Sequence, residues 1–126
     1  MLFRSVPLAD YITMHMPLTD ETKNMLNAER LAKTKKGVRI INCARGGLVD
    51  EHALSEALKS KQVAAAALDV YEGEPVVHPD LPALENVLLI PHVASATTET
   101  RTAMAHLAAD NVIAVLGGRP PVTPVL

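Results

Sequence analysis

The chain has 126 residues, of which 48% are hydrophobic and 21% charged, and this composition is typical of a globular domain with a buried core. A formal net charge of −2, two tyrosines, one phenylalanine and no tryptophan argue against a surface that binds nucleic acid or an anionic membrane. Cys43 is the only cysteine, so an internal disulfide is excluded and a reducing compartment fits; we therefore expect a cytoplasmic protein.

The first third of the chain predicts one strand and two short helices. Residues 1–9 are ambiguous and are expected to form a helix stub or a loop. Residues 11–16 are an apolar run that predicts a buried strand. Residues 19–22 carry side chains that cap a short helix, and residues 27–35 predict a second short helix with Gly37 as its stop.

The middle of the chain alternates between strand and helix. Residues 38–43 are apolar and rich in β-branched side chains, which predicts a second buried strand. A turn follows, and residues 50–60 then show the spacing of an amphipathic helix. The alanine-rich residues 63–70 are compatible with a helix by propensity, but their length and their place after a helix favour a third strand.

The last third begins with a polar, proline-containing loop over residues 71–86. Residues 87–90 predict a fourth buried strand, which ends at Pro91 and His92. A long helix is predicted from Thr97 or Thr98 to residue 116, where two glycines end it.

The alternation of strands and helices predicts an α/β fold with a parallel sheet and right-handed crossovers. About four strands with flanking helices correspond to one half of a doubly wound, Rossmann-type sheet. The sequence has no G-x-G-x-x-G segment, so the glycine fingerprint for a dinucleotide phosphate is absent. No apolar run approaches the roughly 18 residues that a membrane-spanning helix needs.

Polar side chains follow three of the predicted strands. Arg45 follows the second strand, Asp69 and Glu74 follow the third, and His92 follows the fourth. Because the carboxyl ends of parallel strands meet at one edge, Arg45, Glu74 and His92 are expected to converge. A carboxylate beside a histidine stabilises the imidazolium, and an arginine holds a carboxylate and polarises a carbonyl. Such a set suits the reduction of a ketone by a cofactor that brings the hydride.

Each of these residues also has a purely structural interpretation. His92 could bond to loop backbone, Glu74 could be a solvated acid, Asp69 could be a turn residue and Arg45 could pair with a surface acid. The five histidines show no H-E-x-x-H or similar spacing, so no metal site is predicted. No G-x-S-x-G occurs, which argues against a serine nucleophile.

Four segments in order along the chain carry a family resemblance: residues 15–19 with Thr22 (HMPLT), 42–51 (NCARGGLVDE), 67–75 (ALDVYEGEP) and 86–97 (NVLLIPHVASAT). They closely resemble signature stretches of the D-isomer-specific 2-hydroxyacid dehydrogenases. The resemblance runs from about residue 8 to the C-terminus. Residues 98–104 and 119–124 are most similar to the glyoxylate/hydroxypyruvate reductase branch.

The resemblance implies three catalytic residues. Arg45 would bind the substrate carboxylate and polarise the keto group. His92 would be the general acid in reduction and the general base in oxidation, with Glu74 paired to it. The reaction would transfer a hydride between NAD(P)H and a small 2-keto or D-2-hydroxy acid such as glyoxylate or hydroxypyruvate.

The resemblance also implies a set of residues that contact the cofactor. The cofactor would be NAD or NADP, and these residues do not distinguish between the two. The set is His15, Pro17, Cys43, Ala44, Arg45, Asp69, His92, Ala94 and Ser95. Asp69 and Ser95 would lie near the nicotinamide end. Ala94 stands where the family usually has a glycine.

The family's chains are more than twice as long, so the resemblance implies a partial NAD(P)-binding domain over residues 1–118 and an extended tail over residues 119–126. The first Rossmann half, with its glycine fingerprint, and the substrate domain would be absent. The parent protein is expected to be a homodimer that uses a small-molecule substrate and binds neither nucleic acid nor a membrane. The alternative is a catalytically inactive module that only self-associates or binds nucleotide weakly.

Overall fold

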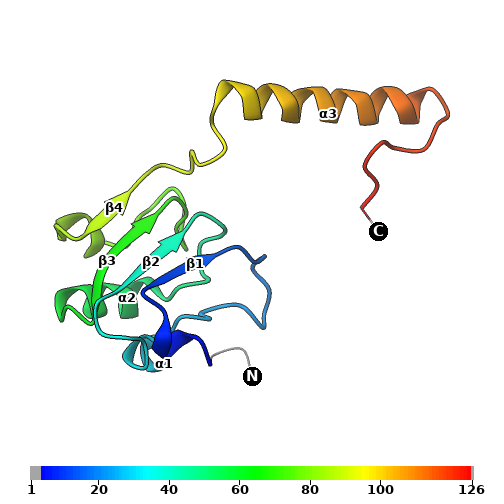
Figure 1. Ribbon diagram of the computed structural model, residues 1–126. Helices are drawn as coiled ribbons and strands as arrows, with labels where there is room; N and C mark the ends of the chain where they lie inside the picture. The colour runs from blue at the N-terminus through cyan, green and yellow to red at the C-terminus, as the bar shows by residue number, and fades with distance from the viewer. Residues whose placement is uncertain (1–3, 126) are drawn as a thin grey trace. The chain divides into compact units, whose positions relative to one another are not determined.

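The computed structural model describes residues 4–125. The chain separates into two compact units, one that ends at His92 and one that begins at Val93; Figure 1 draws both. Part of the ambiguous N-terminal stretch, residues 1–3, lies outside the described residues. In the described part of residues 1–9, Val6–Leu8 forms a short 3-10 helix, η1.

The first unit is built on one sheet of four parallel strands (Figure 1). The strands are β1 (Tyr11–Met14), β2 (Val38–Asn42), β3 (Val63–Leu68) and β4 (Val87–Leu89). Their order in the sheet follows their order in the chain, so successive connections all step in the same direction across the sheet. The predicted α/β fold with a parallel sheet of about four strands is confirmed.

Two capped helices connect the first three strands, α1 (Ala28–Ala32) and α2 (Glu51–Lys59). In Figure 1 both lie on the same side of the sheet, as successive right-handed crossovers in one direction require. Asn27 accepts a hydrogen bond at the start of α1. Asp50 Oδ1 accepts from the backbone N–H of Ala53 at 2.9 Å at the start of α2. Both helices begin within one residue of the starts that the sequence predicted, residues 27 and 50, and both are capped by a side chain.

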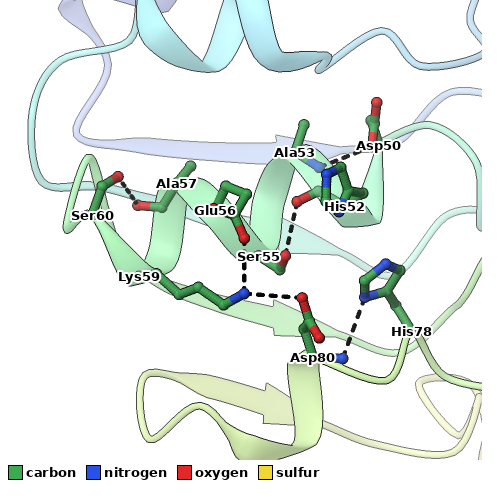
Figure 2. A network of polar contacts seen from close by, with 10 residues as sticks. All are labelled: Asp50, His52, Ala53, Ser55, Glu56, Ala57, Lys59, Ser60, His78 and Asp80. Atoms are coloured by element: carbon green, nitrogen blue, oxygen red, sulfur yellow. Dashed lines mark hydrogen bonds and ion pairs between the residues drawn. The ribbon is translucent and has the colours of Figure 1, made fainter.

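A polar network on the outer side of α2 joins this helix to the loop that leads to β4 (Figure 2). Lys59 Nζ lies 2.8 Å from Glu56 Oε1 and 2.9 Å from Asp80 Oδ2. The rings of His52 and His78 belong to the same surface, with centroids 5.8 Å apart. Exposed ion pairs add little stability, so we expect the network to contribute only weakly to the fold.

The short helix predicted over residues 19–22 is wrong, because this segment forms turns. The Thr22 hydroxyl accepts from the backbone N–H of Thr19 at 2.7 Å and donates to the carbonyl of Pro17 at 2.8 Å. These local side-chain bonds satisfy the backbone in place of a helical turn.

The core of the first unit lies between the sheet and the two helices. Alternate strand positions face it, because successive side chains of a strand point to opposite faces. Its fully buried members include Val38, Ile40 and Val63 from the strands and Leu31, Leu54 and Leu58 from the helices. The small Ala66 is also buried in this layer and lets the helices approach the sheet closely.

The second unit contains α3 (Thr98–Leu116), with Thr97 as its N-cap and Gly117 as its C-cap, and its bounds agree with the predicted helix from Thr97 or Thr98 to residue 116. The tail returns to the helix: Asn111 Nδ2 donates to Thr123 Oγ1 at 2.9 Å, and Thr123 N–H donates to Asn111 Oδ1 at 3.1 Å. Several large apolar side chains of α3 are exposed, namely Met104, Leu107, Val112, Ile113, Val115 and Leu116. The predicted division of the chain at residue 118 stays a prediction.

Candidate active site

The four strands end in one row. Met14 pairs with Asn42, Asn42 with Leu68, and Leu68 with Leu89. The segments that follow the strands therefore leave the sheet from one edge, where ligands bind in open parallel sheets.

A pocket of about 390 Å³ opens at this edge, and Arg45, Glu74 and His92 all line it. Its other lining residues are Leu18, Gly46, Val70, Tyr71, Glu72 and Gly73. The structure thus brings together the three side chains for which the sequence predicted convergence. Their catalytic roles are a separate matter and remain predictions.

His92 and Glu74 form a hydrogen-bonded pair at this pocket. His92 Nδ1 lies 2.9 Å from Glu74 Oε2, and Glu74 Oε1 accepts from the backbone N–H of Tyr71 at 3.0 Å. The bond to His92 and then the bond from Tyr71 lower the pKa of Glu74 below its ordinary value. Glu74 is therefore ionised at neutral pH and orients the imidazole, which leaves His92 Nε2 for another partner.

His92 has a strained backbone, with φ of +53° in the left-handed region. Residues other than glycine rarely occupy this region, with asparagine, aspartate and histidine the most frequent exceptions, and such residues cluster at functional sites. In this conformation the ring of His92 contacts Glu74, although 18 residues separate the two in sequence.

Arg45 is an exposed cation at the apex of the loop between β2 and α2. One guanidinium nitrogen, Nη1, donates to the carbonyl of Ala44 at 2.6 Å. A guanidinium has five N–H donors in a planar fork, so donors remain for a carboxylate and for a carbonyl oxygen.

Tyr71 connects the loops that carry these side chains. From the sequence alone, Tyr71 was not identified as a residue of the site. Its hydroxyl donates to the carbonyl of Ile90 at 2.8 Å, just before His92, and its burial raises the pKa of this hydroxyl. A Cβ atom on Gly46 would overlap the carbonyl oxygen of Tyr71, so Gly46 lets the Arg45 loop touch the Glu74 loop. The sequence signals were a glycine directly after the arginine and a tyrosine at the end of a buried run.

A second pocket of about 360 Å³ adjoins the first through Arg45, which lines both. Its other lining residues are His15, Met16, Pro17, Cys43 and Ala44. Five of the predicted cofactor residues, Arg45 included, therefore share one pocket at the carboxyl edge of β1 and β2. His15 Nε2 lies 2.8 Å from Thr13 Oγ1, which orients this ring at the pocket.

Of the four remaining predicted cofactor residues, His92 lines the first pocket. Asp69 directly follows β3 and is buried, with 1% of its surface exposed. Ala94 and Ser95 belong to the second unit, where both are exposed.

Two further findings concern residues 4–125. In that range, no three or more histidine, cysteine, aspartate or glutamate side chains are grouped so that they could hold a metal ion. Likewise, none of the helices formed by these residues is both long and apolar enough to span a membrane.

Comparison with known protein families identifies the domain. Residues 3–94 match the model of the D-isomer specific 2-hydroxyacid dehydrogenase, NAD binding domain. This match covers most of the chain, and the chain therefore belongs to the D-isomer specific 2-hydroxyacid dehydrogenase family. The resemblance found in the sequence motifs is confirmed.

Relatives and solved structures agree with this assignment. The chain is 53% identical over 115 residues to a glyoxylate reductase of Thermofilum pendens, covering 90% of this chain and 34% of the relative. It is 51% identical over 112 residues to a D-3-phosphoglycerate dehydrogenase of Bacillus subtilis, covering 89% and 21%. The NADPH-dependent glyoxylate/hydroxypyruvate reductase of Sinorhizobium meliloti, solved with NADP and malonate, superposes with a TM-score of 0.90 at 40% identity, covering 95% and 38%.

These comparisons confirm a dehydrogenase family and a nicotinamide cofactor domain, without a choice between NAD and NADP. The chain spans between about a fifth and a third of the length of these curated relatives.

Proposed function

We propose that this chain is the part of a D-2-hydroxyacid dehydrogenase that carries the proton-transfer pair and the substrate-binding arginine. The reaction is the reduction of a small 2-keto acid by NAD(P)H. The observation that supports the proposal most is the pocket shared by Arg45, Glu74 and His92, with the His92–Glu74 bond of 2.9 Å.

Arg45, His92 and Glu74 have different roles toward the substrate. Arg45 binds the carboxylate through its free donors and draws electron density to the keto oxygen. Protonated His92 gives a proton to that oxygen as it becomes an alkoxide, and Glu74 stabilises the imidazolium before the transfer. In the oxidation direction, neutral His92 takes the proton from the hydroxyl group of a D-2-hydroxy acid.

The pocket beside Arg45 fits the nicotinamide end of the cofactor. It lies at the carboxyl edge of parallel strands, and the small side chains of Ala44 and Cys43 are among its lining residues. When bound, the cofactor supplies the hydride to the carbonyl carbon. Arg45 borders both pockets, so a substrate that it holds lies next to the cofactor pocket. The assignments of His15, Pro17, Asp69, Ala94 and Ser95 to the cofactor are part of the proposal.

For the substrate we propose glyoxylate or hydroxypyruvate. The support is the 53% identity to a glyoxylate reductase and the fold shared with a glyoxylate/hydroxypyruvate reductase. The 51% identity to a D-3-phosphoglycerate dehydrogenase supports a phosphorylated hydroxy acid as the second candidate. The alternative of a catalytically inactive module is not favoured, because these relatives are named reductases and dehydrogenases.

The test is the change in absorbance of NADH and NADPH with the purified chain. Glyoxylate and hydroxypyruvate are offered in the reducing direction, and D-3-phosphoglycerate with NAD⁺ or NADP⁺ in the oxidising direction. We expect turnover with a keto acid that is lost in Arg45→Ala. Absence of turnover with all substrates would reject catalysis by this chain alone and assign the reaction to a longer protein.

A cytoplasmic location and a homodimeric assembly also belong to this proposal. The first rests on the single cysteine, Cys43, and the second on the resemblance to the family.

A further inference from the structure

Asn42 is a buried polar residue at the last position of β2, three residues before Arg45. Only 2% of its surface is exposed. It pairs with Met14 of β1 and Leu68 of β3, in a mostly apolar layer. A buried amide is costly unless its donor and acceptor groups are paired, so the bonds that it makes decide its role.

Both polar groups of the Asn42 side chain bond to the loop that carries Arg45. Asn42 Oδ1 accepts from the backbone N–H of Ala44 at 3.1 Å, and Nδ2 donates to the backbone carbonyl of Arg45 at 2.9 Å. Its own backbone carbonyl accepts from the N–H of Asp69 at 2.9 Å, which fixes the residue to β3. The side chain therefore holds the loop from the buried side.

The far end of the same loop is held by a different segment. The N–H of Asn24 donates to the carbonyl of Gly47 at 2.7 Å, and the N–H of Leu26 donates to the carbonyl of Leu48 at 3.1 Å. Asn42 thus supplies the contacts at the beginning of the loop, directly beneath the exposed Arg45.

We propose that Asn42 is a positioning residue that sets the main-chain conformation at Ala44 and Arg45. It thereby sets the direction in which the Arg45 guanidinium meets a substrate carboxylate. Small misplacements of a binding group weaken catalysis strongly, because the reacting atoms must be aligned. The role of Arg45 in this inference rests on the proposed function, whereas the hold on the loop does not.

The first part of the test follows the loop and needs no activity. Asn42→Ala is compared with Asn86→Ala, since Asn86 Nδ2 also donates to two backbone carbonyls, those of Leu58 at 3.2 Å and Ala64 at 3.1 Å. We expect hydrogen exchange of the Ala44 amide to become about tenfold faster in Asn42→Ala, because one hydrogen bond is lost. It should stay as in the wild type in Asn86→Ala. Equal Ala44 exchange in the two variants would overturn the inference.

The second part measures kinetics with glyoxylate. We expect kcat/KM to fall by roughly 10- to 100-fold in Asn42→Ala, mostly through a higher KM, and to change by less than about twofold in Asn86→Ala. The nearly isosteric Asn42→Asp keeps the acceptor and regains a donor when its new carboxyl group is protonated. Its kcat/KM relative to the wild type should therefore rise as the pH is lowered. Slower turnover with an unchanged KM and no such rise would reduce Asn42 to a structural role.

The two parts separate two failures. If the wild type shows no turnover but Ala44 exchange responds to Asn42→Ala, the hold on the loop stands and the proposed function of this chain fails. If Asn42→Ala does not fold, Asn42→Asp is used instead, and the ¹³C chemical shift of the Arg45 carbonyl carbon is measured as a function of pH. We expect this shift to change when the new carboxyl group is protonated, because the protonated group can again donate a hydrogen bond to the Arg45 carbonyl. A carbonyl shift that does not respond would overturn the inference.

Discussion

His92 combines a strained backbone with a charged partner, and this combination is informative at the scale of a single residue. Its φ of +53° costs energy that only the surrounding contacts can offset. Its Nδ1 is held by Glu74 at 2.9 Å, which leaves Nε2 for another partner.

His92→Asn tests the proton transfer without forcing the backbone, because asparagine tolerates the left-handed region. We expect the chain to stay folded and kcat to fall by about 10²- to 10⁴-fold, the usual contribution of a general acid. Circular dichroism and steady-state kinetics measure the two effects. His52→Asn, at an exposed position of α2, is the matched control and should retain activity. Full activity in His92→Asn would assign the proton to another group.

The lowered pKa of Glu74 predicts how the free energy of unfolding changes with pH. Its pKa is lowered in the folded state, so its ionised form stabilises the fold above the ordinary glutamate value of 4.5. That contribution should be lost as the pH falls from 4.5 through the lower folded pKa. Urea unfolding at a series of pH values should show a steeper loss in the wild type than in Glu74→Gln. Glu85→Gln, at an exposed loop position, should behave as the wild type. Parallel curves for Glu74→Gln and the wild type would contradict the assigned bonds.

At the scale of the element, capping decides where α2 begins. Asp50 Oδ1 accepts from the N–H of Ala53, and the negative charge also suits the N-terminal end of the helix dipole. We expect Asp50→Ala to lower the free energy of unfolding by about 1 kcal/mol, measured by urea titration. Asp20→Ala removes an exposed carboxylate from a turn and should change it by less than about 0.5 kcal/mol. An equal change in the free energy of unfolding in Asp50→Ala and Asp20→Ala would show that the Asp50 cap does not stabilise α2.

The contact between the Arg45 loop and the Glu74 loop depends on one missing side chain. A Cβ atom on Gly46 would overlap the Tyr71 carbonyl, whereas a Cβ atom on Gly73 would lie 3.7 Å from the carbonyl oxygen of Val76, an ordinary contact. We expect Gly46→Ala to lower the free energy of unfolding by about 1–3 kcal/mol through overpacking. Gly73→Ala should be close to neutral for stability. A stable Gly46→Ala protein with an unchanged unfolding midpoint would show that the loops separate easily.

For the molecule as a whole, we predict a homodimer. Val112 and Ile113 of α3 are 57% and 59% exposed, and exposed apolar surface of this kind marks an interaction site. The expected homodimer has twice the 13.5 kDa mass of one chain. Sedimentation equilibrium should detect it, and Ile113→Lys should shift it toward the monomer. A wild type that sediments at 13.5 kDa over the whole concentration range would reject the dimer.

Local patterns in the sequence were sufficient for most of the fold. Strands and helices follow from hydrophobic periodicity and from caps such as Asp50 and Thr97, which act over a few residues. The prediction failed at residues 19–22, where threonine side chains bond to nearby backbone and make turns. Capping residues are also turn residues, so the sequence alone does not distinguish the two outcomes.

The parallel sheet, the edge of the sheet where the candidate site lies, and the family could all be predicted from the sequence, because they follow from the alternation of strands and helices and from the order of the motifs. The convergence of Arg45, Glu74 and His92 was also predicted from the order of the strands, but the bond of 2.9 Å between His92 and Glu74 and the pocket that both share with Arg45 come from the folded structure. The folded structure also shows that Asn42 bonds to the Arg45 loop through its side chain and that Gly46 lets this loop approach the carbonyl of Tyr71. These are contacts between groups whose distances and directions depend on register, strand length and backbone angle, and no local pattern contains them.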